Sequence, residues 1–166
     1  MTREARGRAL VWRAAMPEAE VVAGLLVEFR DHFGRTWPSE NAFIAGVERL
    51  MGQADAEYLL AAADADSAPA AVCQLRYRFG VWYAAEDAWL EDLYVRESAR
   101  RRGLAAALVE AALARARERG CRRMELDVNT ANAAGRGLYE RFGFSAGSSE
   151  QGGENLMMRK VLEEGG

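Results

Sequence analysis

Apolar and polar residues alternate along the chain with two different periods, and each period predicts one kind of element. Apolar residues recur three or four positions apart, the spacing of an amphipathic helix, in residues 17–33, 39–51, 103–119 and 133–142. Shorter apolar or alternating runs predict strands at residues 9–13, 57–63, 70–79, 88–95, 124–128 and 155–162. The predicted order is therefore β-α-α-β-β-β-α-β-α-β.

Residues typical of helix ends stand at the borders of these stretches. Pro17 suits the first turn of a helix, and Ser39 is a predicted N-cap. Glycine commonly follows the last turn of a helix, and three predicted helices are followed by Gly34, Gly52 and Gly120. The stretch 145–153 is rich in Gly and Ser and predicts a mobile loop.

The order of elements predicts an α/β (α+β) fold with a single mixed, mostly antiparallel central sheet and helices on both faces. The strand at 124–128 is expected to be central, because only Glu125 and Asp127 interrupt its apolar run. Residues 89–128 form a strand–helix–strand unit, for which parallel strands are expected. The chain of 166 residues fits one domain over residues 1–166, with residues 1–7 expected to be disordered.

Composition and charge narrow the function classes. The net charge of −3 argues against nucleic-acid binding, which needs a basic face to displace the counterions of phosphates. His32 and the two separated cysteines, Cys73 and Cys121, have no metal-ligand spacing, so no metal is expected and both thiols are predicted to be buried. No apolar run reaches the roughly 18 residues of a membrane span, and residues 1–7 lack a signal-peptide core. We therefore expect a cytoplasmic protein that does not bind membranes.

A basic segment lies between the predicted strand 88–95 and the predicted helix 103–119. It reads Arg100-Arg101-Arg102-Gly103-Leu104-Ala105. The first amides of a helix are unpaired and lie at the positive end of its dipole, so they bind anions. Gly103 lets a phosphate approach the backbone closely, and the arginines add charge. A solvated basic helix start is the alternative, and the segment matches neither the Rossmann nor the Walker A pattern.

A second segment further along the chain makes the interpretation more specific. It reads Asn132-Ala133-Ala134-Gly135-Arg136-Gly137-Leu138-Tyr139-Glu140-Arg141-Phe142-Gly143-Phe144. It resembles the Asn-x-x-Ala-x-x-x-Tyr-x-x-x-Gly-Phe segment of the GNAT superfamily of N-acetyltransferases. The basic segment resembles the [Gln/Arg]-x-x-Gly-x-[Gly/Ala] motif of the same superfamily, and the order and spacing of the two motifs agree as well. One departure is Gly135, where the superfamily usually has Ala.

The resemblance implies how acetyl-CoA would bind. In the superfamily it occupies a V-shaped opening between two central parallel strands. The strand edge of Leu93, Tyr94 and Val95 would pair with the pantetheine amides. The backbone of Arg101, Arg102, Gly103, Leu104 and Ala105, with Arg100 beside it, would hold the pyrophosphate. Asn132 would contact the pantetheine arm or the acyl region, and Tyr139 would lie near the thioester sulfur.

Acetyl transfer to an amine needs a base and a proton donor. The amine arrives protonated, with a pKa near 10, and the departing thiolate gains from a proton. Tyr139 suits the donor role, with a packed aromatic side chain as the alternative. Glu91 is the favoured base and Asp92 the second candidate, because residues 89–95 resemble the strand of polyamine and diamine acetyltransferases that carries an acid at the Glu91 position. Adjacent strand residues face opposite ways unless a bulge intervenes, and either acid could instead form a cap or a salt bridge.

The acceptor is less closely defined. The superfamily lines its acceptor groove with the first two helices, their connecting loop and the central hairpin, which are here the loop 32–38 and the hairpin residues 78–83. Aromatic side chains there could hold a cation by their ring faces, or they could be core or dimer contacts. Glu28 and Asp31 could attract an amine, although solvated charges are the alternative.

The predicted function is transfer of an acetyl group from acetyl-CoA to a primary amine by direct attack in a ternary complex. A small-molecule acceptor is favoured: a polyamine, an amino-acid-like amine or an aminoglycoside-type antibiotic. The alternatives are acetylation of a protein N-terminus or lysine, and a non-catalytic acyl-CoA-binding module. Such a module would be expected to lack the proton donor, whereas Tyr139 is present. A homodimer is expected from the resemblance alone.

Overall fold

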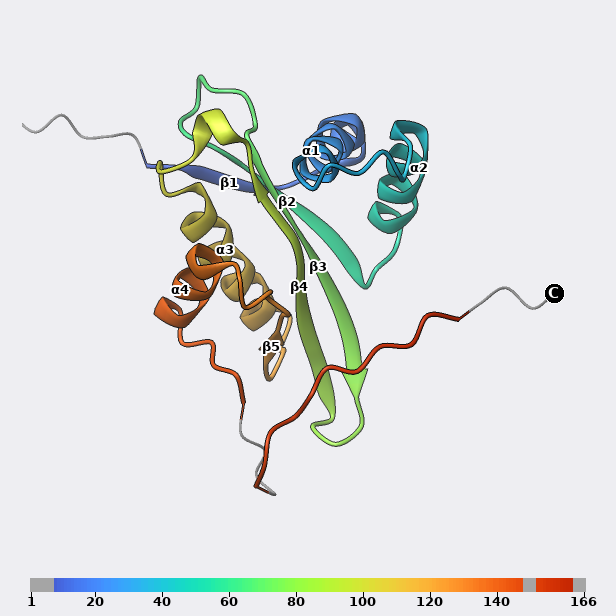
Figure 1. Cartoon of the computed structure of the whole chain (residues 1–166), viewed down its shortest axis with the longest axis vertical. Coiled ribbons are helices and arrows are strands. Elements are labelled where there is room, and N and C mark those ends of the chain that lie inside the picture. Colours follow the sequence, from blue (N-terminus) through green and yellow to red (C-terminus); the bar gives the residue numbers. More distant parts are fainter. Residues whose placement is uncertain (1–7, 148–151, 163–166) are drawn as a thin grey trace, which may run out of the picture. The chain divides into compact units, whose positions relative to one another are not determined.

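The computed structural model describes residues 8–147 and 152–162 (Figure 1). The segment 1–7, predicted to be disordered, and part of the predicted loop 145–153 lie outside the described residues. The chain divides into two compact units, Met1–Asn129 and Thr130–Gly166. Within the described ranges, no helix is both long and apolar enough to cross a membrane.

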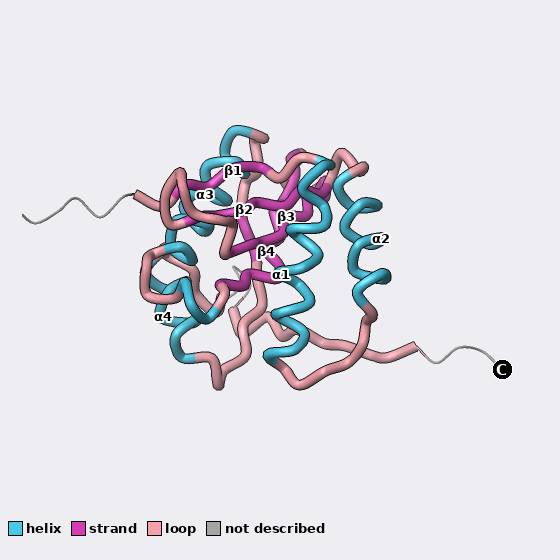
Figure 2. The backbone as a smooth tube through the Cα atoms, turned by 90° about the horizontal axis from the view of Figure 1, so that it is seen from above, coloured by secondary structure: helices cyan, strands magenta, loops and turns pink. Residues whose placement is uncertain are grey.

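A five-stranded sheet forms the centre of the first unit (Figures 1 and 2). Its strands follow one another in chain order: β1 (Leu10–Arg13), β2 (Ala56–Ala62), β3 (Ala71–Gly80), β4 (Ala85–Val95) and β5 (Met124–Glu125). The first four strands pair in an antiparallel way, and β5 is parallel to β4. The predicted mixed, mostly antiparallel sheet is therefore confirmed, as is the parallel pair that flanks the third helix.

Helices cover both faces of this sheet (Figures 1 and 2). The helices α1 (Ala19–His32) and α2 (Glu40–Met51) lie on one face, and α3 (Leu104–Glu118) lies on the other. The core under α1 contains Val22, Leu25, Leu26, Tyr58, Leu60 and Val72. Burying each large apolar side chain stabilises the fold by about 1.5–3 kcal/mol. This packing fixes α1 on the sheet, and with it the start of the loop that leads to α2.

The helix ends agree with the sequence in one case and differ in another. Ser39 caps α2 as predicted, since its Oγ accepts a hydrogen bond from the amide of Ala42 at 3.2 Å. Pro17 was expected to open the first helix, but it lies in a short 3-10 turn, and α1 begins two residues later. The carboxylate of Glu18 accepts a hydrogen bond from the amide of Ala15 at 3.0 Å, and this bond holds the tight turn.

A buried carboxylate joins three strands to α3. Glu57 in β2 is only 4% exposed, and the hydroxyl of Tyr77 in β3 donates to it at 2.7 Å. Arg115 of α3 donates to both oxygens of Glu57, and Arg13 of β1 lies at 3.3 Å. Burial alone would raise the pKa of Glu57, but the hydrogen bonds from Arg115 and Tyr77 and the two arginine charges outweigh it and lower the pKa. Glu57 is therefore charged in the folded protein.

The second unit is built around one helix, α4 (Ala133–Arg141). Asn132 caps it, because its Oδ1 accepts a hydrogen bond from the amide of Gly135 at 2.9 Å. Leu138 is the buried residue of the helix, and the rings of Tyr139 and Phe144 meet edge to face with centroids 5.9 Å apart.

Two strand predictions are wrong. Residues 155–162 form no strand, because a strand needs backbone hydrogen bonds to a neighbouring strand and, within the described structure, no strand ladder joins this segment to the sheet. The strand predicted at 124–128 is shortened to the two residues of β5 and is not central. A central strand is paired on both edges, and no strand in the described part of the chain covers the outer edge of β5.

Candidate functional site

Strand β4 contains a bulge at the two predicted acids. Glu91 pairs with Gln74 of β3, and Tyr94 pairs with Val72, so two residues of β4 stand opposite one residue of β3. Asp92, the first of these two residues, has a φ of +52°, which is uncommon for a residue other than glycine. Bulges turn side chains away from the regular alternation and are frequent beside active sites. The bulge therefore allows Glu91 and Asp92 to lie on one face of the sheet, although they are adjacent in the chain.

Both carboxylates lie on the sheet face that carries α1 and α2. Glu91 stands in one cross-strand row with Gln74 and Tyr58, and Tyr58 packs under α1. Burial, followed by the charge of Asp92, raises the pKa of Glu91. The residue Asp92 is accessible to solvent, but surrounding protein restricts the hydration of its carboxylate, and this effect with the charge of Asp127 raises its pKa. A raised carboxyl pKa moves these groups toward the range in which a general base operates at neutral pH.

Two residues beside the acids were not singled out by the sequence. Tyr58 is 3% exposed, and its pKa is raised by burial and then by the charges of Asp92 and Glu91. Gln74 is 2% exposed, and its side-chain nitrogen has no hydrogen-bond partner among the described residues. A polar glutamine within the apolar run of residues 70–75 was the signal that could have indicated it.

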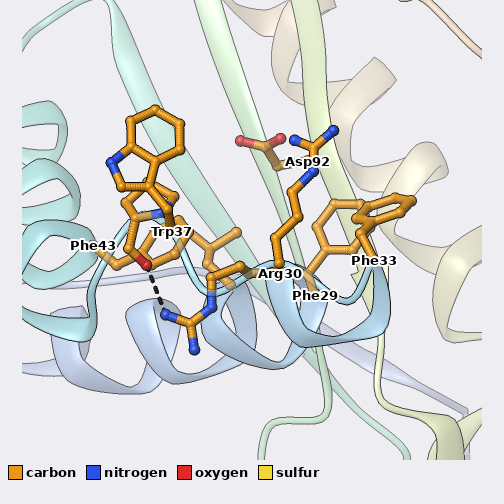
Figure 3. Close-up of a pocket in the computed structure, with 9 residues that line it drawn as sticks. Phe29, Arg30, Phe33, Trp37, Phe43 and Asp92 are labelled. Carbon is orange, nitrogen blue, oxygen red and sulfur yellow. Dashed lines mark hydrogen bonds between the residues drawn. The ribbon is translucent and has the colours of Figure 1, made fainter.

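A pocket of about 170 Å³ opens on the same face (Figure 3). Helix α1, the loop that follows it, the start of α2 and strand β4 form its walls, through Leu26, Phe29, Arg30, Phe33, Arg35, Trp37, Pro38, Phe43 and Asp92. Figure 3 shows Trp37 and Phe43 at one side and Phe29 and Phe33 at the other. The predicted acceptor loop 32–38 therefore contributes four of the lining residues, and Asp92 brings one of the two candidate acids to the pocket.

Other side chains suggested for the acceptor lie elsewhere or have partners within the protein. Glu28 forms a two-pronged pair with Arg96, with distances of 3.0 and 3.1 Å, and Asp31 pairs with Arg30 at 2.7 Å. The hairpin residues 78–83 are not among the residues that line the pocket. We therefore assign neither Glu28, Asp31 nor the hairpin to this pocket.

The basic segment forms the entry to α3. Arg101 and Gly103 have φ values of +63° and +76°, and α3 begins at Leu104 without a side-chain cap. None of the three arginines forms a salt bridge with a residue of the described ranges. Leu104 is buried and Ala105 is half-buried. The guanidinium of Arg100 donates a hydrogen bond to the carbonyl of Val95 at 3.2 Å. Uncapped amides beside arginines that form no salt bridge in the described structure are the arrangement that binds phosphate.

Strand β4 also leaves part of its outer edge without a strand partner. It pairs with β5 only through Ala88 and Trp89. Residues 90–95, which include the predicted Leu93, Tyr94 and Val95, have no strand beside them on that edge in the described structure. An extended ligand with amide groups could add to such an edge in the way that a further strand does.

The two remaining predicted residues lie in the second unit. Asn132 uses its side-chain oxygen to cap α4, and Tyr139 is half-buried on the same helix. A Cβ at position 135 would stand 2.5 Å from the side-chain nitrogen of Asn132, so an alanine there would require the Asn132 amide group to shift.

The cysteines and acidic residues give no further site. Among the described residues, no group of three or more His, Cys, Asp or Glu side chains is placed to hold a metal ion. Cys73 is buried as predicted, whereas Cys121 is half-buried because it lies in the turn after α3 and outside any strand.

Comparison with known proteins adds relatives of the same fold. The model of the acetyltransferase (GNAT) family matches residues 22–144. A Bacillus subtilis (strain 168) protein described as a candidate [ribosomal protein bS18]-alanine N-acetyltransferase is 26% identical over 91 residues, which are 51% of this chain and 60% of that protein. The match thus spans less than two thirds of the curated relative.

Two crystal structures resemble most of the chain. One is a candidate acetyltransferase from Arthrobacter sp. FB24, with a TM-score of 0.79 and 29% identity, covering 92% of this chain and 95% of that one. The other is also described as a candidate acetyltransferase, with a TM-score of 0.81 and 25% identity, covering 93% and 99% of the two chains.

The match to the family model includes most of the chain and both motifs identified in the sequence. The predicted fold and enzyme class are confirmed at the level of the family, and the diamine or polyamine subtype stays a prediction. The chain belongs to the acetyltransferase (GNAT) family.

Proposed function

We propose that this chain transfers the acetyl group of acetyl-CoA to the primary amine of a small molecule. The observation that carries the proposal is the bulge of β4, which brings two acids with raised pKa values to one face of the sheet. The same strand leads into the uncapped, arginine-rich start of α3. An acceptor site and an anion site are thus parts of one continuous stretch, residues 91–105.

Acetyl-CoA would bind along this stretch. The pyrophosphate would accept hydrogen bonds from the amides of residues 101–105 and pair with Arg100, Arg101 and Arg102. The pantetheine amides would bond to the outer edge of Leu93, Tyr94 and Val95, which no described strand covers. Asn132 would contact the pantetheine arm or the acyl group. When bound, acetyl-CoA supplies the activated acetyl group.

The reaction joins the amine nitrogen to the thioester carbonyl carbon and breaks the carbon–sulfur bond. Asp92, which lines the pocket, attracts the ammonium, and Glu91 takes the proton that the ammonium must lose. Tyr139 gives a proton to the departing thiolate. A backbone amide near Leu93 or Val95 stabilises the carbonyl oxygen as it becomes negative, an effect that is usually worth about 2.7–4 kcal/mol.

A protein acceptor is the second candidate, because the Bacillus subtilis relative is named for acetylation of a ribosomal protein. The limited volume of the pocket, about 170 Å³, favours a small acceptor, since a peptide would need an extended groove. A cytoplasmic location and a homodimer stay predictions, and sedimentation of the purified chain would test the second.

Release of CoA thiol across a panel of amines tests the proposal. We expect release that requires acetyl-CoA, a small primary amine and Glu91. The Glu91→Gln variant should lower kcat/KM by about 100-fold or more, whereas Glu118→Gln, a change at an exposed acid of α3, should leave it unchanged. Turnover only with a peptide N-terminus would favour the protein acceptor. Tight acetyl-CoA binding without turnover would favour a non-catalytic module.

A further inference from the structure

Four of the nine residues that line the pocket are aromatic. Phe29 and Phe33 come from α1 and the residue that follows it, Trp37 from the loop and Phe43 from α2 (Figure 3). Phe33 is 60% exposed and Trp37 is 77% exposed, although both are large apolar side chains. Exposed apolar side chains grouped around a cavity indicate a surface that a ligand covers.

The polar groups of the pocket are few. Asp92 is the one carboxylate among the lining residues. The guanidinium of Arg30 is already bonded to the carbonyl of Pro38 at 2.6 Å and to Asp31 at 2.7 Å, and that of Arg35 lies 5.9 Å from the centre of the Phe33 ring. The pocket therefore offers one carboxylate, two guanidiniums that already have contacts within the protein, and apolar walls. It has no second carboxylate for the far end of a diamine and few polar groups for the hydroxyls of a sugar.

The volume of the pocket limits the size of the apolar group that enters it. The cavity measures about 170 Å³, and an apolar cavity of about 150 Å³ in another protein accommodates benzene. One ring of that size therefore fits. A bulkier group with several rings would have to stay outside the pocket or displace the loop 33–38.

We infer that the acceptor is a small primary amine with one compact apolar group of about the size of a phenyl ring. Its ammonium pairs with Asp92, and its apolar group lies among Phe29, Trp37 and Phe43. The inference rests on the proposed function, because it names the substrate class of the same site. It differs from the diamine acceptor suggested by the sequence, since the pocket has no second carboxylate and its two guanidiniums would repel a second cation.

Three probes of different chemistry test this inference on the full chain: 2-phenylethylamine, ethylamine and 1,4-diaminobutane. The apolar ring should raise kcat/KM for 2-phenylethylamine at least about tenfold over ethylamine, as burial of one aromatic group predicts. The diamine should be acetylated no faster than ethylamine. A kcat/KM for the diamine, or for an aminosugar, that equals or exceeds the value for 2-phenylethylamine would overturn the inference.

Two tryptophan variants test whether the preference for 2-phenylethylamine arises in this pocket. Trp37→Ala should remove most of the preference for 2-phenylethylamine over ethylamine. Trp82→Ala should leave the preference intact, because Trp82 is 98% exposed at the tip of the β3–β4 hairpin and does not line the pocket. An equal loss of preference in both variants would contradict the assignment to this pocket.

Failure of the inference can be told apart from failure of the proposed function. Acetylation of other amines with no preference for 2-phenylethylamine would overturn the inference and leave the proposed function standing. If no amine is acetylated, calorimetric titration of the chain with 2-phenylethylamine decides the inference. Binding that Trp37→Ala weakens at least about tenfold would support it, and absence of binding would overturn it.

Discussion

Two glycines at opposite ends of α3 allow a direct test of the proposed pyrophosphate site. Gly103 precedes α3 with a φ of +76°, and Gly120 follows it with a φ of +82°. A Cβ at either position would meet no atom within 4 Å, so the backbone conformation alone resists a side chain. Because a left-handed conformation costs an L-residue about 1–2 kcal/mol, Gly103→Ala and Gly120→Ala should each lower the free energy of unfolding by about that amount.

The two variants should differ in CoA binding. A Cβ at Gly103 would enter the space that a phosphate needs, and loss of one hydrogen bond to a charged group is worth about 1.5–3 kcal/mol. This corresponds to a loss of CoA affinity of about 10- to 150-fold, whereas Gly120→Ala should bind CoA as the wild type does. Urea unfolding measures the loss of stability expected in both variants. Calorimetric titration with CoA measures the affinity, which should fall only in Gly103→Ala. Equal CoA affinities for the two variants would refute the assignment.

Three further predictions concern single side chains. Tyr139→Phe should lower kcat by about 100-fold with little change in acetyl-CoA affinity, and an unchanged kcat would remove Tyr139 as the donor. On acidification, kcat/KM should fall at a higher pH than an ordinary glutamate base would give, because burial and the charge of Asp92 raise the pKa of Glu91 and the base must be deprotonated to act. Asp92→Asn should move this fall to lower pH. A fall at the same pH in the variant would contradict the effect of the Asp92 charge on Glu91. Glu57→Gln should lower the free energy of unfolding by about 1–3 kcal/mol at neutral pH. The pKa of Glu57 in the folded protein lies below its ordinary value of 4.5, so the stability that its charged carboxylate contributes is present above that pH and is lost as the pH falls through the folded pKa. A stability difference between Glu57→Gln and the wild type that persists unchanged in acid would argue against the ion pair.

Local features of the sequence were sufficient to predict most of the elements. The helical period, the cap at Ser39 and the glycines after helices depend on neighbouring residues alone, so α1, α2, α3 and α4 lie close to their predicted ranges. The Arg100–Ala105 segment could be predicted for the same reason, since a strand, a glycine and a helix start adjoin one another in the chain. Long-range pairing was predicted less well, as the segment 155–162 and the short edge strand β5 demonstrate.

The candidate site depends on features that one segment alone does not define. The bulge at Asp92 is a mismatch of register with β3, so it requires knowledge of which residues pair across the two strands. Phe29 and Phe43 repeat at helical spacing in the same way as core residues, and only their position around the pocket distinguishes them. Gln74 belongs to the site because Tyr58 and Glu91 stand on either side of it in the sheet.

The most direct test of the account follows both products of one reaction. The full chain is mixed with acetyl-CoA and 2-phenylethylamine, and mass spectrometry measures the acetylated amine while a thiol reagent measures free CoA. The account predicts that the two products appear in equal amounts and that Glu91→Gln slows both together. A chain that fails to bind acetyl-CoA, or that yields no acetylated product with this amine, the other amines or a peptide N-terminus, would contradict it.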